Sequence, residues 1–79
     1  MAIAFVLIRT LPGFERKVYY KLYELMGNGI FEVHPVIGNY NLIAKIKAED
    51  SEKLGYIVLN KINHIENINS TEMLTTIQF

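Results

Sequence analysis

The sequence predicts an α+β fold of the ferredoxin-like type, a βαββαβ sandwich in which one antiparallel sheet carries two helices on one face. Extended runs rich in β-branched and aromatic residues alternate with segments of helical spacing in that order. The two middle runs are separated only by Gly38-Asn39, a pair that suits a two-residue hairpin loop. This connectivity favours the strand order 4-1-3-2, with strands one and three inside the sheet.

The first strand is predicted over residues 3–9, where a short apolar run ends before the chain breaker Leu11-Pro12-Gly13. Successive side chains of a strand alternate between the two faces of the sheet, and both faces are apolar here. One face carries Ile3, Phe5 and Leu7, and the other carries Ala4, Val6 and Ile8. The helices can cover only one of these faces, so we expect the sheet of a second subunit to cover the other.

A helix is predicted from Phe14, and Gly27-Asn28-Gly29 ends it with residues that tolerate positive φ. Its apolar stripe consists of Phe14, Val18, Leu22, Leu25 and Met26. The two hairpin strands are expected at Ile30–Ile37 and Tyr40–Lys47. Pro35 cannot donate a ladder hydrogen bond, which assigns the first hairpin strand to an edge of the sheet.

A second helix is predicted after Asp50 or Ser51, either of which can cap it, and it should end near Asn63-His64. Its apolar stripe consists of Leu54, Ile57, Val58 and Ile62. From Ile68 to Gln78 the chain returns to β character and supplies the fourth strand.

Length and composition indicate a single domain over residues 1–79 that associates with itself. A chain of 79 residues buries too little surface to be very stable alone, and it contains no cysteine for a disulfide or a thiolate metal site. Eight basic residues balance eight acidic ones, so no positive field attracts nucleic acid or anionic lipid. The apolar run Met1–Ile8 lacks the basic start and cleavage site of a signal sequence. We therefore expect a cytoplasmic protein that binds neither a membrane nor, by itself, nucleic acid.

The polar residues show no spacing that indicates catalysis or metal binding. A nucleophile with its base, a pair of carboxylates or a cluster of metal ligands would be needed, so no catalytic residue, cofactor or metal is predicted. His34 is interpreted as an ordinary half-exposed histidine, and a general base in a cleft is the alternative. The tyrosines of the first helix are interpreted as core or subunit contacts.

An ordered set of features resembles a stand-alone regulation-of-amino-acid-metabolism (RAM) domain, the effector-binding C-terminal half of the Lrp/AsnC (leucine-responsive) transcription regulators. The resemblance covers essentially the whole chain. Its features are an apolar first strand, the helix start Gly13-X-Glu15 with Val18 and Leu22, the hairpin Gly-X-Tyr-X-Leu at 38–42, a second helix ending in Lys61-Ile62, and a threonine-bearing last strand.

The resemblance implies a homodimer formed by facing sheets, a ring of such dimers, and a small effector, usually an amino acid, bound between dimers near the hairpin. The ligand-binding residues expected here are Gly38, Asn39, Tyr40, Asn41, Leu42, Thr71 and Met73. The family pattern usually has Asp where this chain has Asn41. We expect no helix-turn-helix before the first strand, so an effect on transcription would pass through co-assembly with a full-length Lrp/AsnC-type regulator.

Two other functions remain open from the sequence. The chain is alternatively an assembly domain without a ligand, or a small dimeric α/β-barrel enzyme with a cleft on the opposite face of its sheet. A position of His34 inside a pocket would favour the enzyme.

Overall fold

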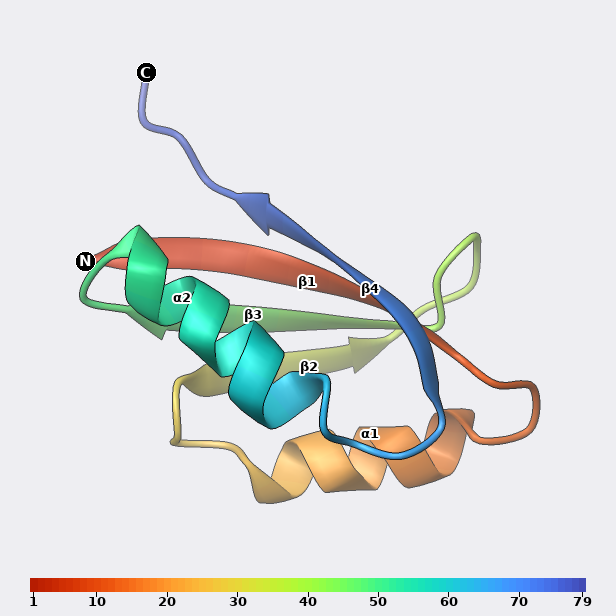
Figure 1. Cartoon of the computed structure of the whole chain (residues 1–79). Helices are drawn as coiled ribbons and strands as arrows, with labels where there is room; N and C mark the ends of the chain where they lie inside the picture. Colours follow the sequence, from red (N-terminus) through yellow and green to blue (C-terminus); the bar gives the residue numbers. More distant parts are fainter.

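The computed structural model describes all 79 residues and contains one four-stranded antiparallel sheet (Figure 1). The strands are β1 (Ala2–Thr10), β2 (Ile30–Pro35), β3 (Leu42–Ala48) and β4 (Ile68–Thr75). Their order across the sheet is β2-β3-β1-β4, which confirms the predicted ferredoxin-like topology and places the proline-bearing strand β2 at an edge.

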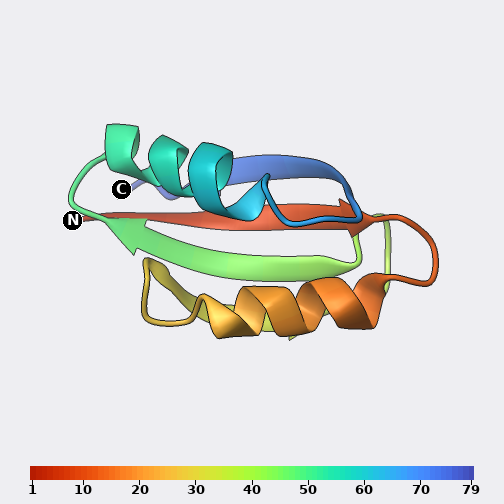
Figure 2. The same cartoon turned by 60° about the horizontal axis from the view of Figure 1, so that its bottom comes forward.

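Both helices lie on the same side of the sheet (Figure 1). Helix α1 (Glu15–Glu24) packs over β2, whereas α2 (Ser51–Ile57) packs over β3 and β1 (Figure 2). The last part of the second helix, Val58–Ile62, forms a π-helical segment. The core between helices and sheet comprises the fully or almost fully buried side chains of Ala4, Val6, Ile8, Val18, Leu22, Ile30, Val33, Leu42, Ala44, Ile46, Leu54, Ile57, Val58 and Ile62.

The two predicted faces of β1 behave differently in the structure. Ala4, Val6 and Ile8 are completely buried under the helices. Phe5 and Leu7 lie on the opposite side of the sheet, which no helix covers, and each is only half-buried. We call this second side the open face. The structure thus confirms that a single chain leaves one apolar face of its central strand without a cover.

The start of the second helix follows from one side chain. Asp50 has an extended backbone, and its carboxylate accepts a hydrogen bond of 2.9 Å from the Lys53 backbone N–H. This is an N-cap, and it decides between the two predicted capping residues in favour of Asp50.

Neither helix has the length and apolar character that a membrane-spanning helix needs.

The loop between β2 and β3 is longer than predicted. The strands end at Pro35 and resume at Leu42, so the connection spans residues 36–41 instead of the two residues Gly38-Asn39. It is closed by a 2.9 Å hydrogen bond from the Val36 N–H to the Asn41 carbonyl. Gly38 has φ +152°, so the predicted positive φ is present within this wider turn. The prediction of a two-residue loop was wrong because the ladder between β2 and β3 ends at the pair Pro35 and Leu42, where the proline has no N–H to donate.

Candidate functional site

The candidate site is the loop over residues 36–41 together with the ends of β1 and β4 beside it. Asn41 attaches the loop to β1 in two ways. Its backbone N–H donates to the Ile8 carbonyl at 2.8 Å, and its side-chain Oδ1 accepts from the Thr10 N–H at 2.8 Å. The Thr10 hydroxyl lies 3.4 Å from the same oxygen. Asn41 is therefore already bonded within the chain, and its amide oxygen holds the base of the loop in place.

A second set of contacts fixes the outer part of the loop from strand residues that the sequence did not single out. The Arg9 Nε donates to the Asn39 carbonyl at 3.0 Å, and the guanidinium lies 5.1 Å from the centre of the Tyr40 ring. The Tyr40 hydroxyl in turn donates to Glu72 Oε1 at 2.9 Å. The Arg9 and Glu72 side chains thus contact different parts of Tyr40.

The Glu72 carboxylate is the main influence on the pKa of Tyr40. The hydrogen bond to Glu72 is the main cause that raises the pKa of Tyr40, because it stabilises the protonated hydroxyl. Desolvation and the negative charge of Glu72 act in the same direction, and the positive charge of Arg9 opposes them. Tyr40 is therefore a hydrogen-bond donor over a wide pH range.

The remaining predicted residues lie around this loop in different environments. Gly38 and Asn39 are exposed at the tip. The Leu42 side chain is buried in the core, so only its backbone borders the loop. Thr71 and Met73 lie opposite Ile8 and Val6, on the helix side of β4.

Thr71 and Met73 are thus separated from the group around Tyr40 by the sheet itself. The Thr71 hydroxyl donates to Asn63 Oδ1 at 3.0 Å, at the end of the second helix. Strand alternation places Glu72, and neither of its neighbours, on the open face beside Tyr40. The same alternation could have identified Glu72 from the sequence, once the register with β1 was known.

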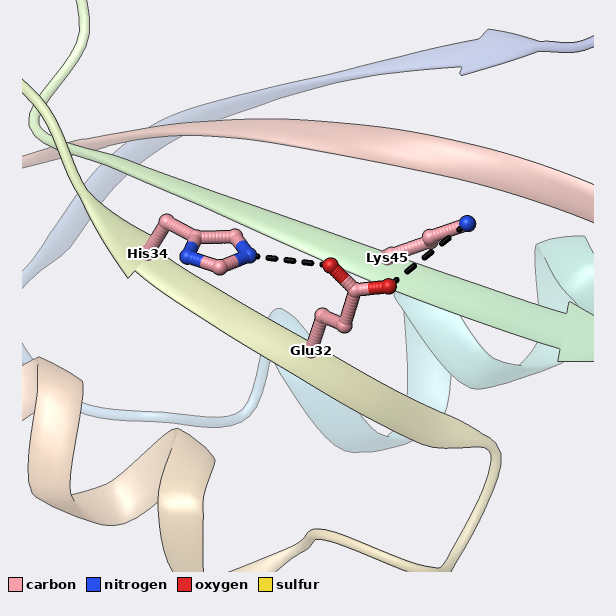
Figure 3. Close-up of polar contacts among 3 residues, drawn as sticks. All are labelled: Glu32, His34 and Lys45. Atoms are coloured by element: carbon pink, nitrogen blue, oxygen red, sulfur yellow. Dashed lines mark hydrogen bonds and ion pairs between the residues drawn. The ribbon is translucent and has the colours of Figure 1, made fainter.

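A separate polar cluster lies on the open face at the β2 edge (Figure 3). The Glu32 carboxylate lies 3.0 Å from His34 Nε2 and 3.6 Å from Lys45 Nζ. The Lys45 ammonium also lies over the rings of Phe5 and Phe31, at 5.6 and 5.2 Å from their centres. His34 has a mostly exposed side chain and borders neither the groove beside α1 nor the groove beside α2.

This cluster gives a pH-dependent prediction. The hydrogen bond with His34, supported by Lys45, lowers the pKa of Glu32 below its ordinary value of 4.5. Its contribution to folding is therefore complete above that ordinary value and is lost as the pH falls through the lower folded-state value. Glu32→Gln should flatten the acid decline in the free energy of unfolding, as measured by urea unfolding between neutral pH and about pH 3.

Glu66 serves as the matched control for this test, because its side chain forms neither a hydrogen bond nor an ion pair. Glu66→Gln should leave the shape of the acid decline unchanged. Equal curves for wild type and Glu32→Gln would show that the cluster contributes nothing to stability.

A groove of about 770 Å³ lies elsewhere, between α1 and the turn after the second helix. Its lining is mixed, with Lys17, Lys21 and Lys61 opposed by Glu24 and Glu66. The Lys21 ammonium pairs with Glu24 at 3.5 Å, and Lys61 donates to the Asn28 carbonyl at 3.1 Å. Size alone therefore does not identify this groove as a binding site, whereas the loop over residues 36–41 carries specific, oriented contacts.

Comparison with known proteins decides the family. The family model described as "Lrp/AsnC ligand binding domain" matches residues 3–78. The chain belongs to the Lrp/AsnC ligand-binding domain family. An uncharacterised HTH-type transcriptional regulator of Pyrococcus horikoshii is 34% identical over 71 residues, which are 86% of this chain and 46% of that protein. The chain thus spans about half the length of the curated relatives it matches, and these matches support a regulatory, ligand-binding role.

Solved structures of similar length share both the sequence pattern and the fold of this Lrp/AsnC-type domain. The protein TTHA0845 from Thermus thermophilus superimposes with a TM-score of 0.90 at 32% identity, covering 100% of this chain and 96% of that one. The hypothetical protein PHS023 from Pyrococcus horikoshii gives a TM-score of 0.85 at 32% identity, covering 100% and 93%. The ferredoxin-like fold is therefore shared by proteins little longer than this domain.

Proposed function

We propose that this Lrp/AsnC-type domain is an oligomeric regulatory module that binds a small zwitterion, an amino acid above all, at the loop over residues 36–41. The observation that carries the proposal is that hydrogen bonds hold the base of this loop while its tip is exposed. Its base is held to β1 through Asn41 and Thr10, while Gly38 and Asn39 at the tip remain exposed. A loop that is fixed at its base and exposes backbone N–H groups at its tip suits the binding of a carboxylate.

The open face supports the oligomeric part of the proposal. Phe5 and Leu7 of β1 are half-buried there, and Leu74 of β4 is 48% exposed. Leu74 lies directly opposite Phe5 in the sheet, so the three side chains form one apolar patch. A second copy of the same sheet would cover this patch, because the two surfaces are equally apolar and can face each other across a two-fold axis.

An effect on transcription would require co-assembly with a DNA-binding relative, and this step of the proposal rests on the family. The relatives of about twice this length are named HTH-type regulators. The open face and the loop of this chain are the surfaces that a mixed oligomer would use. The enzyme alternative gains no support from His34, which is mostly exposed and contacts Glu32 on an edge strand.

A thermal-shift screen tests the ligand. At a concentration near 100 times Kd, a bound amino acid should stabilise the folded state by about 2.7 kcal/mol per site, which raises Tm by roughly 10–20 °C in a domain of this size. The panel should contain the proteinogenic amino acids, the matching 2-oxo acids and the matching amines. If none of these compounds shifts Tm, the proposed effector function is wrong and a ligand-free assembly domain is the better interpretation.

The variant Asn41→Asp tests whether the bound ligand carries an ammonium group. The Asp carboxylate keeps an oxygen for the Thr10 N–H and adds a negative charge beside the loop. Ligands that carry an ammonium group should bind about tenfold more tightly to this variant, as measured by calorimetry, because a charge-assisted hydrogen bond is gained. The 2-oxo acids serve as the internal control, since the added charge should weaken their binding.

A further inference from the structure

The loop over residues 36–41 contains no charged side chain of its own, yet two opposite charges border it. Arg9 comes from the end of β1, and Glu72 comes from β4. Both are exposed, and both lie on the open-face side of the sheet. Their charges are therefore contributed by strands that are distant from the loop in sequence.

The register of β1 with β4 places Arg9 and Glu72 close together, yet the two side chains form no ion pair with each other. Arg9 lies opposite Ser70, two residues before Glu72 on the same face of β4. Such diagonal neighbours are about 7–8 Å apart. Arg9 and Glu72 nevertheless form no ion pair with each other or with any other residue. Each side chain instead contacts Tyr40, Arg9 at the ring and Glu72 at the hydroxyl.

Each charged group also keeps unused hydrogen-bonding capacity. Arg9 uses only Nε, which donates to the Asn39 carbonyl, so both terminal nitrogens of the guanidinium are free. Glu72 uses only Oε1, which accepts from Tyr40, so Oε2 is free. The contacts with Tyr40 and Asn39 orient both groups before any ligand arrives, which lowers the entropy cost of binding.

We propose that Arg9 and Glu72 are the two charged recognition groups of the effector site, with Arg9 binding the carboxylate and Glu72 the ammonium of an α-amino acid. This inference rests on the proposed function and assigns the specificity within it. The two terminal nitrogens of a guanidinium match the two oxygens of a carboxylate. Glu72 supplies the negative charge that pairs with an ammonium group.

The ligand would lie at the rim of the open face, next to Tyr40 and away from the apolar patch at Phe5. A subunit that covers this face also excludes water from the rim, which strengthens both charge interactions. A zwitterion brings one charge of each sign, so it balances Arg9 and Glu72 without leaving a net charge at the junction.

The test measures ligand selectivity in Glu72→Gln by calorimetry, with each amino acid that binds the wild type and with its 2-oxo acid and amine analogues. The glutamine oxygen still accepts from the Tyr40 hydroxyl, so the loop keeps its position. Amino acids should bind about tenfold to a hundredfold more weakly to Glu72→Gln, whereas the 2-oxo acids should not lose affinity. Arg9→Gln should weaken the binding of both amino acids and 2-oxo acids.

Glu32→Gln is the matched control, because it removes one carboxylate from the same face at the opposite edge of the sheet. It should leave affinity unchanged. Amino-acid binding that is equally tight in wild type and Glu72→Gln would overturn the assignment of Glu72 while leaving the effector function intact. Binding of 2-oxo acids alone by the wild type would overturn the assignment of Glu72 and, with it, the zwitterion named in the proposed function. If no member of the panel binds the wild type, the proposed function itself fails, and this assignment fails with it.

Discussion

A Leu7→Asp variant is expected to sediment and scatter light as a single folded chain of 9.1 kDa, whereas the wild type should form a dimer or a larger assembly at micromolar concentration. Leu7 lies on the open face and is half-buried in the single chain. A carboxylate at this position remains hydrated in the monomer but would have to be buried, without a partner, between two facing sheets. The oligomeric state is measured by light scattering or analytical ultracentrifugation, and folding by circular dichroism.

Val6→Asp provides the contrasting substitution on the same strand. Val6 is fully buried between the sheet and the helices, so a carboxylate there should unfold the chain itself. The pair of variants separates loss of assembly from loss of folding, because the residues are adjacent in sequence and lie on opposite faces of the sheet. A wild type that is monomeric and stable, or a Leu7→Asp variant that still assembles, would contradict the covered-face proposal.

Gly38→Val should abolish the ligand-induced rise in Tm. Gly38 has φ +152°, and an added Cβ would meet no atom within 4 Å. The penalty is therefore backbone strain, of about 1–3 kcal/mol, and not a steric clash with a neighbour. A valine relieves this strain by changing the loop conformation, which displaces the exposed N–H groups that the proposed carboxylate contact needs. Calorimetry and thermal shift with the strongest ligand of the panel measure the loss.

Gly27→Val is the control for that experiment. Gly27 has φ +91°, its added Cβ would also meet no atom within 4 Å, and it lies in the turn between α1 and β2. This variant should lose stability through the same kind of strain but retain the wild-type affinity. If Gly38→Val keeps the wild-type affinity as well, the effector site does not include the tip of this loop.

The sequence was informative where the pattern repeats over several residues. Alternation along β1 predicted that Ala4, Val6 and Ile8 share one face of the sheet, and all three are completely buried. The apolar stripe of the first helix predicted the core residues Val18 and Leu22, which are fully buried. Pro35 predicted an edge strand because a missing N–H cannot be compensated inside a sheet. Such features depend on local periodicity and backbone chemistry, which a single sequence contains.

The width of the loop and the composition of the candidate site depended on contacts between distant residues. Asn41 appears beside a two-residue turn in the sequence, but the pairing of β2 with β3 ends at Pro35 and Leu42 and leaves residues 36–41 in the connection. Arg9 and Glu72 carry no local signal, because their position beside Tyr40 follows only from the register of β1 with β3 and β4. Local patterns in the chain thus determine its strands, helices and core. Only folding brings Arg9, Tyr40 and Glu72 together, because strand register is a relation between segments and no single segment encodes it.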